Sequence, residues 1–168
     1  MNFAFCLYKY FPYSGLSRDF LRILMECKNR GHKAEVFVSS WQGPRPIDDT
    51  KITVLGEWGE KLLPNHVKDR RYYKKLRRQL KAFRFDAVIG FNRMPGLDVY
   101  YGADFCYIGR VQKANPPISR LTARYRHFCD FEKAVFGSNN QTLILSLSER
   151  EKKVYQEYYH TPNSRFFV

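Results

Sequence analysis

The sequence predicts an α/β fold in which a Rossmann-like parallel sheet is flanked by helices. Short apolar runs alternate with longer amphipathic stretches, an order typical of strand–helix–strand units. The first apolar run, Asn2–Tyr8, leads through a Pro/Ser/Gly turn into a helix, as the first loop of such a sheet does. The 168 residues are enough for one domain with a buried core.

The first helix is expected over Leu16–Arg30, because apolar residues recur on one face at helical spacing. These residues are Phe20, Ile23, Leu24 and Cys27. Gly31 supplies a C-terminal stop. Two β-rich runs follow, Ala34–Ser39 and Lys51–Leu55, the second after a loop rich in Pro, Gly and Asp. The first third of the chain therefore predicts three strands and one helix.

The rest of the chain continues the alternation. The expected elements are a charged helix over Lys68–Arg84, strands over Ala87–Phe91 and Val99–Gly102, a helix over Ile118–Phe136, a strand over Thr142–Ser146 and a helix over Ser148–Tyr159. Ser148 is the expected N-cap of the last helix. Arg165–Val168 resembles the start of another strand, so we expect residues 1–168 to be the first domain of a longer protein.

Composition restricts the function classes. Hydrophobic residues make up 44% of the chain, which argues against disorder, and no apolar run approaches the roughly 20 residues of a membrane span. Because no signal-type segment begins the chain and the four cysteines are widely spaced, we expect a cytoplasmic protein without a metal site. The net charge of +13 predicts an anionic partner: nucleic acid, lipid head groups or phosphorylated sugars.

The turn around Gly15 is the first candidate site. A helix N-terminus presents unpaired backbone N–H groups, which suit a phosphate, although many plain strand-to-helix turns have the same sequence pattern. Asp19, expected in the first helical turn, either complements the positive helix end or bonds sugar hydroxyls. Lys9, expected just past the first strand, either meets phosphate or is simply solvated.

Several segments together resemble the lipopolysaccharide core glucosyltransferase I family, which adds glucose to an inner-core heptose in Gram-negative bacteria. The segments are Ala4-Phe-Cys-Leu-Tyr-Lys-Tyr-Phe-Pro12, Gly15-Leu-x-Arg-Asp-Phe20, Arg30-Gly-His32, Gly90-Phe-Asn-Arg-Met-Pro-Gly-Leu-Asp-Val-Tyr100, Ala103-Asp104, Arg120-Leu-Thr-x-Arg-Tyr-Arg-His-Phe128 and Phe131-Glu132. They occur in the family's order and span nearly the whole chain. The block after Gly90 is the most specific of them. The family's usual Gly-Gly in the first turn is Ser14-Gly15 here.

The resemblance implies the N-terminal half of a GT-B architecture, in which two Rossmann-like domains face each other across a cleft. Residues 1–168 would be the acceptor-binding domain, truncated before a C-terminal domain that holds most of the UDP-glucose donor. The implied reaction is transfer of glucose with retention of anomeric configuration, without a cofactor or metal. Ser14 and Gly15 would then lie at the substrate, where backbone N–H groups stabilise charge on the departing pyrophosphate. We expect weak or no transfer by this domain alone.

Polar residues that follow apolar strands form the second candidate site. Asn92, Arg93 and Asp104 come after predicted strands, and open α/β sheets bind ligands at the carboxyl ends of their strands. Asn92 and Arg93 are predicted to bind substrate. Asp104 is predicted to orient or deprotonate the acceptor hydroxyl. Two alternatives remain open for Asp104: a leaving phosphate oxygen takes the proton instead, or the aspartate only caps the next segment.

Two basic regions predict contact with an anionic surface. Lys68–Arg84 is either a solvated helix face or the binding surface for an anionic partner. In Ile118–Phe136, the apolar stripe consists of Ile118, Leu121, Tyr125 and Phe128, and the basic line beside it consists of Arg120, Arg124 and His127. A basic amphipathic helix with aromatic residues suits an anionic membrane, although the stripe could also pack on the sheet while the arginines hydrate. The predicted docking residues are Arg110, Lys113, Arg120, Arg124 and Arg126.

The sequence thus favours a glucosyltransferase on the cytoplasmic face of the inner membrane, bound peripherally. The alternative is a non-catalytic basic α/β domain that binds anionic lipid or nucleic acid. Nucleic acid is the less favoured ligand, because Tyr72 and Tyr73 are the only aromatic residues inside the densest basic run and no known nucleic-acid motif is present.

Overall fold

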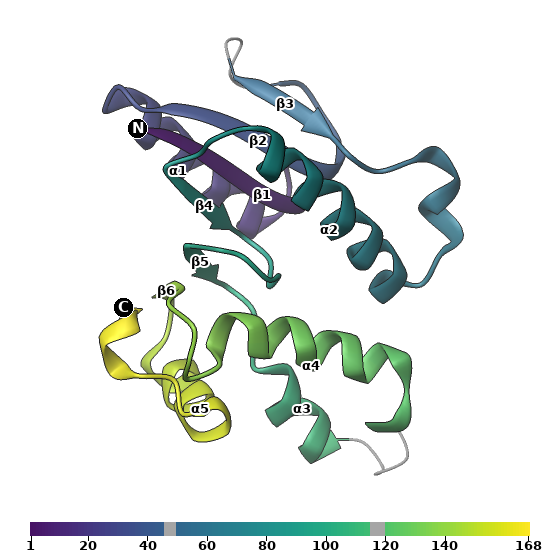
Figure 1. Cartoon of the computed structure of the whole chain (residues 1–168), viewed down its shortest axis with the longest axis vertical. Helices are drawn as coiled ribbons and strands as arrows, with labels where there is room; N and C mark the ends of the chain where they lie inside the picture. The colour runs from purple at the N-terminus through teal and green to yellow at the C-terminus, as the bar shows by residue number, and fades with distance from the viewer. Residues whose placement is uncertain (46–49, 115–119) are drawn as a thin grey trace. The chain divides into compact units, whose positions relative to one another are not determined.

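The computed structural model describes residues 1–45, 50–114 and 120–168, and the side chains of Lys61, Lys113 and Ala114 lie outside this description. Its contacts divide the chain into two compact units, Met1–Phe91 and Asn92–Val168. Each unit is an α/β layer of parallel strands with helices packed on them (Figure 1).

Unit 1 contains a four-stranded parallel sheet in the order β3-β2-β1-β4. Its elements are β1 (Asn2–Tyr10), α1 (Gly15–Asn29), β2 (Lys33–Trp41), β3 (Lys51–Val54), the 3-10 helix η1 (Trp58–Leu62), α2 (Asn65–Ala82) and β4 (Ala87–Gly90). The central strand β1 is buried from Ala4 to Leu7, as expected for a strand covered on both faces. Helix α1 lies behind the sheet and α2 in front of it (Figure 1).

Aromatic side chains hold the two helices of unit 1 on the sheet. On α1, Phe20 is fully buried and packs edge-on against Phe5 and Phe91. On α2, Tyr72 is buried and donates a hydrogen bond from its hydroxyl to the Phe37 carbonyl at 2.8 Å. Burial of aromatic side chains of this size contributes about 2–3 kcal/mol each, so these rings anchor the helices.

The helix ends in unit 1 correct two predicted boundaries. Helix α1 begins at Gly15, with Ser14 as N-cap, and ends with Gly31 at a φ of 78°, where its N–H donates to the Lys28 carbonyl. The predicted glycine stop is therefore confirmed. Helix α2 runs over Asn65–Ala82 instead of Lys68–Arg84, because Phe83 is extended, with φ −124° and ψ 148°.

Unit 2 contains three parallel strands in the order β5-β6-β7. Its elements are β5 (Val99–Gly102), α3 (Tyr107–Ala114), α4 (Ala123–Phe136), β6 (Leu143–Ser146), α5 (Glu149–Tyr159), the 3-10 helix η3 (Asn163–Arg165) and β7 (Phe166–Phe167). Phe136 joins these elements: its ring stacks on Tyr155 at 3.5 Å between centroids and meets Tyr100 edge-on. The start of a strand predicted at Arg165–Val168 is confirmed as β7.

Two helices of unit 2 differ from the prediction. Helix α3 was not predicted as a separate element. Helix α4 begins at Ala123 instead of Ile118, because Thr122 is extended and its hydroxyl caps the helix by accepting from the Tyr125 N–H at 3.1 Å. Ile118 itself lies outside the described residues. The N-cap predicted at Ser148 is confirmed, since its hydroxyl accepts from the Arg150 N–H.

Buried Arg165 completes the core of unit 2. Its guanidinium donates to three backbone carbonyls, of Thr142 at 2.9 Å, of Gly137 at 2.8 Å and of Val135. The last two lie at the C-terminal end of α4, where helical carbonyls lack intrahelical partners. Arg165 therefore caps α4 and ties the segment before β7 to it.

Candidate functional site

Hydrogen bonds to serine hydroxyl groups fix the conformation of the turn between β1 and α1. Ser14 caps α1 by accepting from the Ser17 N–H at 3.4 Å, and the buried Ser17 hydroxyl accepts from the Phe11 N–H at 3.2 Å. The Ser14 N–H donates to the Phe11 carbonyl at 3.2 Å. These bonds fix the backbone of the turn without covering Gly15, which is exposed.

Two backbone donors of this turn are available to a ligand. Among the described residues, no protein group accepts a hydrogen bond from the N–H of Gly15 or Leu16, and these are the first two N–H groups of the helix. A Cβ placed on Gly15 would meet no atom within 4 Å, so the space above it is open. Unpaired donors at a helix start beside open space suit an anion such as a phosphate.

Lys9 and Asp19 lie near this turn but not where they were predicted. Lys9 is exposed and lies within β1, paired with Ser40 of β2, because the strand continues to Tyr10. Asp19 lies beyond the first turn of α1, because the helix begins at Gly15, and no acidic residue occupies that turn. The Asp19 carboxylate lies 3.8 Å from the Arg18 guanidinium. The role of an acidic residue in the first turn therefore does not apply to Asp19.

The second candidate site, in unit 2, is organised by the buried carboxylate of Glu132. One oxygen accepts from the Tyr107 N–H at 2.7 Å and from the Arg93 guanidinium. The other accepts from the Ile108 N–H at 3.1 Å and from the Tyr159 hydroxyl at 2.7 Å. Glu132 is completely buried, so this set of donors is what makes burial of its charge tolerable.

Arg93 links Glu132 to Asp104. Its side chain is 16% exposed, donates to Glu132 and to the Phe105 carbonyl at 3.1 Å, and brings Nε to 3.9 Å from Asp104 Oδ2. Burial disfavours the arginine charge, but the surrounding tyrosines and the two carboxylates outweigh this and raise its pKa. The side chain predicted to bind substrate is thus held inside unit 2 by carboxylates of its own chain. Asn92, directly before it, is half-buried.

Asp104 presents a partly exposed carboxylate beside buried hydrogen-bond donors. Its side chain is 40% exposed, and Oδ2 accepts from the Tyr100 hydroxyl at 3.3 Å. The Tyr155 hydroxyl donates to the Asp104 backbone carbonyl at 2.9 Å. Burial, and next the Asp104 charge, raise the pKa of Tyr100 well above its usual value, so Tyr100 stays a hydrogen-bond donor. The Asp104 carboxylate is oriented and still reachable from solvent.

The alternative that Asp104 caps the next segment is wrong. Helix α3 begins three residues later, and its first N–H groups, on Tyr107 and Ile108, donate to Glu132. The Cys106 N–H before them donates to Glu151 at 3.2 Å. Because other carboxylates occupy the capping positions, the Asp104 carboxylate remains available for another role.

The cysteines differ in exposure, which gives a test of the two cores. Burial raises the pKa of Cys6, and burial together with the Glu132 charge raises the pKa of Cys106 to about 12. Since only the thiolate reacts and its fraction at pH 8 falls about tenfold per unit of raised pKa, both thiols should be inert in the native protein.

Cys27 and Cys129 are half-buried. We expect a disulfide reagent to label these two first, faster as pH rises, and to label Cys6 and Cys106 only on unfolding. Rapid native labelling at Cys106, mapped by mass spectrometry, would contradict this.

The predicted docking residues of unit 2 are largely exposed arginines on α3, on α4 and in the turn before α4. Arg110, Arg120, Arg124 and Arg126 are exposed, whereas the side chain of Lys113 lies outside the described residues. Arg110 lies over the Phe105 ring at 4.7 Å, and Arg124 over the Phe128 ring at 5.8 Å. Leu121, in the turn before α4, is 74% exposed.

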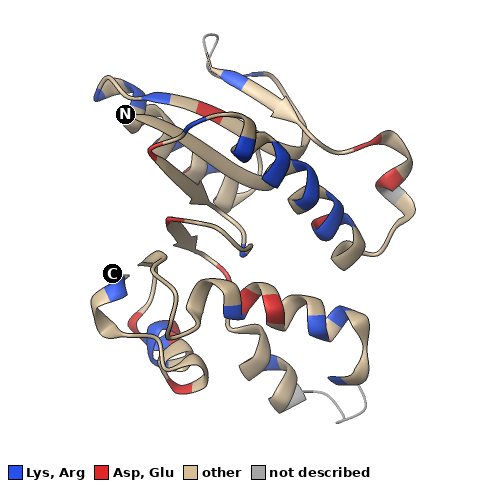
Figure 2. Ribbon diagram, in the orientation of Figure 1, with Lys and Arg blue, Asp and Glu red and all other residues tan. Residues whose placement is uncertain are grey.

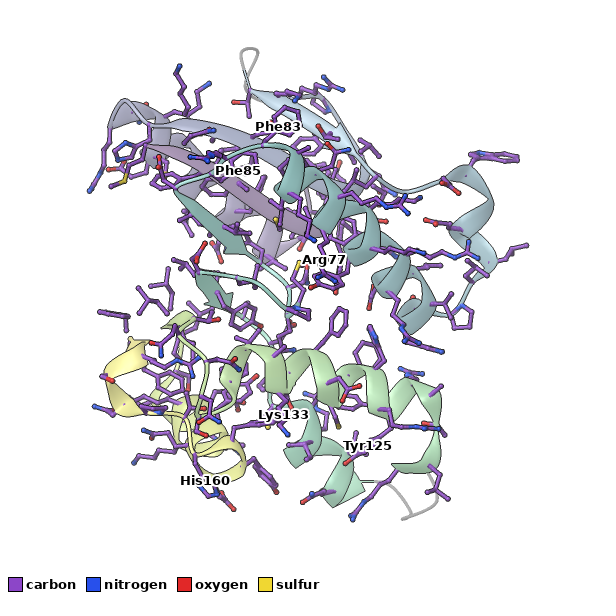
Figure 3. All side chains as sticks on the ribbon, viewed as in Figure 1. Arg77, Phe83, Phe85, Tyr125, Lys133 and His160 are labelled. Carbon is purple, nitrogen blue, oxygen red and sulfur yellow. The ribbon has the colours of Figure 1, made fainter. Side chains whose placement is uncertain are left out.

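His127 does not belong to this basic line. It is buried and packs against the rings of Phe128 and Phe131, with centroids at 5.1 and 4.1 Å. The prediction failed because it assumed a helix starting at Ile118 with one solvated flank, whereas the side of α4 that carries His127 faces the interior of unit 2. Tyr125 and Lys133, labelled in Figure 3, lie on the same helix, and Lys133 is exposed.

No helix among the described residues is long and apolar enough to cross a bilayer. Within residues 1–45, 50–114 and 120–168, no group of three or more His, Cys, Asp or Glu side chains is arranged to hold a metal ion. The acidic residues of the second site, Asp104 and Glu132, are instead bound to arginine, tyrosine and backbone N–H groups.

Sequence reasoning missed the role of Glu132, although a signal was present. On α4, Glu132 occupies the same face as Phe128, Val135 and Phe136, so a carboxylate stands within an apolar stripe. A charge in that position needs a buried partner, and Arg93 is that partner. The partner itself could not be deduced, because 39 residues separate the two.

Comparison with known proteins confirms the predicted resemblance and fold class. The chain is 42% identical over all 168 residues to the lipopolysaccharide glucosyltransferase WaaG of Escherichia coli strain K12. The crystal structure of WaaG, a glycosyltransferase involved in lipopolysaccharide biosynthesis, matches 99% of the chain with a TM-score of 0.93 at 40% identity. The chain spans 44% of the length of this relative. No family model matches the chain.

Proposed function

Because the chain matches a lipopolysaccharide glucosyltransferase in both sequence and fold, we propose that it forms the acceptor-side half of a glycosyltransferase of lipopolysaccharide synthesis. The whole enzyme would have the GT-B architecture and transfer glucose from UDP-glucose to an inner-core heptose, with retention of configuration and without a metal. The observation that carries the proposal is the identity of 42% along the entire chain.

The β1–α1 turn would serve the leaving group. As the glycosidic bond to the donor breaks, negative charge develops on the departing pyrophosphate. Among the described residues, no protein group accepts from the N–H groups of Gly15 and Leu16, and Gly15 is exposed, so these groups could donate to that charge as it grows. Lys9, exposed near the end of β1, would add positive charge.

Asp104 would act on the acceptor. Its carboxylate is partly exposed and is oriented by the Tyr100 hydroxyl, so it can accept a hydrogen bond from the attacking sugar hydroxyl. Arg93 Nε lies 3.9 Å from Asp104 Oδ2 and places a positive charge beside the carboxylate. Whether the proton then passes to Asp104 or to a phosphate oxygen of the donor, orienting the hydroxyl is the role this geometry supports.

A transfer assay tests the proposed function. The protein that contains this chain is incubated with labelled UDP-glucose and a heptose-terminated lipopolysaccharide core, with UDP-galactose as the matched donor control. We expect label in the core only with UDP-glucose, and no turnover by residues 1–168 alone. Transfer of another sugar would overturn the donor assignment, and turnover by residues 1–168 would refute the expectation of an inactive half.

The arginines of unit 2 would hold the enzyme on the cytoplasmic face of the inner membrane. Arg110, Arg120, Arg124 and Arg126 are exposed, and each basic residue near an anionic lipid surface contributes about 1 kcal/mol. Phe105 and Leu121, 59% and 74% exposed, would add apolar contact with the head-group region.

Reversing two of these charges should weaken membrane binding without unfolding the protein. For Arg120→Glu with Arg124→Glu, we expect binding to phosphatidylglycerol vesicles to fall by at least about tenfold, because two attractions become repulsions. Co-sedimentation measures the binding and circular dichroism the fold. The matched control is Arg150→Glu with Lys153→Glu, which reverses two exposed charges on α5. Equal losses in the two variants would show that only net charge matters.

A further inference from the structure

A continuous basic stripe runs along the exposed face of α2 in unit 1. Arg70, Lys74, Arg77 and Lys81 follow one another at helical spacing, and all four are exposed. At 1.5 Å per residue the stripe is about 16 Å long. Figure 2 shows the helix coloured for basic residues along most of its length, and Figure 3 labels Arg77 on it.

The counter-charges near α2 do not neutralise this stripe. Glu57 and Glu60 pair with Lys75, at 2.7 and 3.5 Å, and Glu60 lies 3.8 Å from Arg71. None of the four stripe residues forms an ion pair within the described ranges. Like charges at i and i+4 destabilise a helix, so a stripe of this kind is stabilised when an anionic surface binds it.

The 3-10 helix η1 contacts α2 beside the stripe, through Lys75 and Arg71, and carries exposed apolar side chains. Glu57 and Glu60 face α2, and the Lys75 ammonium also donates to the Leu55 carbonyl, so η1 is held against the helix. Trp58 and Leu62 are 89% and 96% exposed. Tryptophan is enriched where a protein meets the lipid head groups, and a basic helix beside exposed apolar groups is typical of interfacial binding.

Nucleic acid fits this surface less well. Bases stack on exposed aromatic rings that lie along the basic run, whereas Trp58 lies outside that run, on η1. Tyr72, one of the two candidates there, is fully buried, and its hydroxyl is bonded to the Phe37 carbonyl. An exposed leucine such as Leu62 offers bases no stacking surface, whereas it can enter the head-group region of a bilayer.

We infer that η1 and the basic stripe of α2 form a docking surface for an anionic lipid bilayer, with Trp58 and Leu62 entering the head-group region. This surface belongs to unit 1 and shares no residue with the docking arginines of unit 2, Arg110, Arg120, Arg124 and Arg126. It is therefore a second membrane contact, and it does not depend on the proposed transferase activity.

Removing the stripe charges tests the electrostatic part. The full 168-residue chain carrying Arg70→Gln, Lys74→Gln, Arg77→Gln and Lys81→Gln is compared with a control that loses four exposed charges elsewhere, Arg22→Gln, Lys33→Gln, Arg150→Gln and Lys153→Gln. We expect the stripe variant to lose more than about tenfold in affinity for phosphatidylglycerol vesicles, and the control to lose about threefold or less. Equal losses would overturn the proposal.

Tryptophan fluorescence tests the apolar part. The chain has two tryptophans, and Trp41→Phe keeps an aromatic ring at the position that stacks on Tyr10 while leaving Trp58 as the sole tryptophan. We expect the emission of Trp58 to shift to the blue on addition of anionic vesicles and to stay unchanged with neutral phosphatidylcholine vesicles. Binding to anionic vesicles without a shift would show that η1 does not enter the head-group region and would overturn that part.

Two further measurements distinguish lipid from nucleic acid as the ligand, and the stripe from the docking arginines of unit 2 as the binding surface. A duplex DNA oligonucleotide that bound the stripe more tightly than vesicles at the same salt would replace lipid as the ligand and overturn the proposal. Combining the stripe variant with Arg120→Glu and Arg124→Glu should reduce vesicle binding further than either set alone. If the variant with Arg120→Glu and Arg124→Glu loses binding and the stripe variant does not, the stripe is not a docking surface, and only the proposed docking through the unit 2 arginines remains.

Discussion

Replacing Glu132 with alanine should destabilise unit 2 by about 3–5 kcal/mol, the range found when one partner of a buried ion pair is removed. The carboxylate is completely buried and accepts from Arg93, from the Tyr159 hydroxyl and from two backbone N–H groups at the start of α3. Its loss leaves the Arg93 charge largely buried without its closest partner. Urea unfolding followed by circular dichroism measures the change.

Two comparison variants make this prediction specific. Glu26→Ala removes a 57% exposed carboxylate that pairs with Arg30, and it should cost less than about 0.5 kcal/mol. Arg93→Met should cost less than Glu132→Ala, because the remaining carboxylate keeps both α3 N–H groups and the Tyr159 hydroxyl. If Glu132→Ala and Glu26→Ala had the same small effect, the buried carboxylate would not organise unit 2.

In the complete protein that we propose to be a transferase, Asp104→Asn should lower turnover by roughly 10²–10⁴-fold if the carboxylate accepts the acceptor's proton, which is the usual range for general-base catalysis. The amide keeps the size of the side chain and its bond from Tyr100, but it cannot take a proton. The expected signature is a lower kcat with a nearly unchanged KM for the acceptor. Initial rates at saturating UDP-glucose measure both constants.

The same assay separates the two proton routes. If a phosphate oxygen of the donor takes the proton and Asp104 only orients the hydroxyl, the amide retains part of that role and the loss shrinks to about tenfold, mainly in KM. Asp130→Asn is the matched control, because it removes an exposed carboxylate from α4. A kcat and a KM for the acceptor that both equal those of this control would remove Asp104 from the reaction.

Local patterns predicted the elements whose signals lie within a few residues. The apolar face of α1, the Gly31 stop and the Ser148 cap depend on neighbours within one or two turns, and all three are confirmed. The start of α4 was placed too early because the cap at Thr122 competes with the helical periodicity that precedes it. Helix α3 was missed because its start is capped from a distant helix.

The candidate sites were predicted unevenly for the same reason. Gly15 and Asp104 follow strands, and their positions relative to those strands can be read from the sequence. That Arg93 is held by Glu132, and that His127 points inward, depends on packing between segments far apart in the chain. Periodicity identifies which face of a helix is apolar, but not which other segment covers it.

Arg165 bears on how the protein is made on the ribosome. The carbonyls at the end of α4 obtain their guanidinium partner only after residue 165 has left the exit tunnel, although the helix itself emerges about 30 residues earlier. Unit 1 ends at Phe91 and has all its strands by then. We therefore expect nascent chains that are arrested while residue 165 is still inside the tunnel to carry a protease-resistant unit 1 and a protease-sensitive unit 2. Unit 2 should become protease-resistant abruptly once Arg165 emerges.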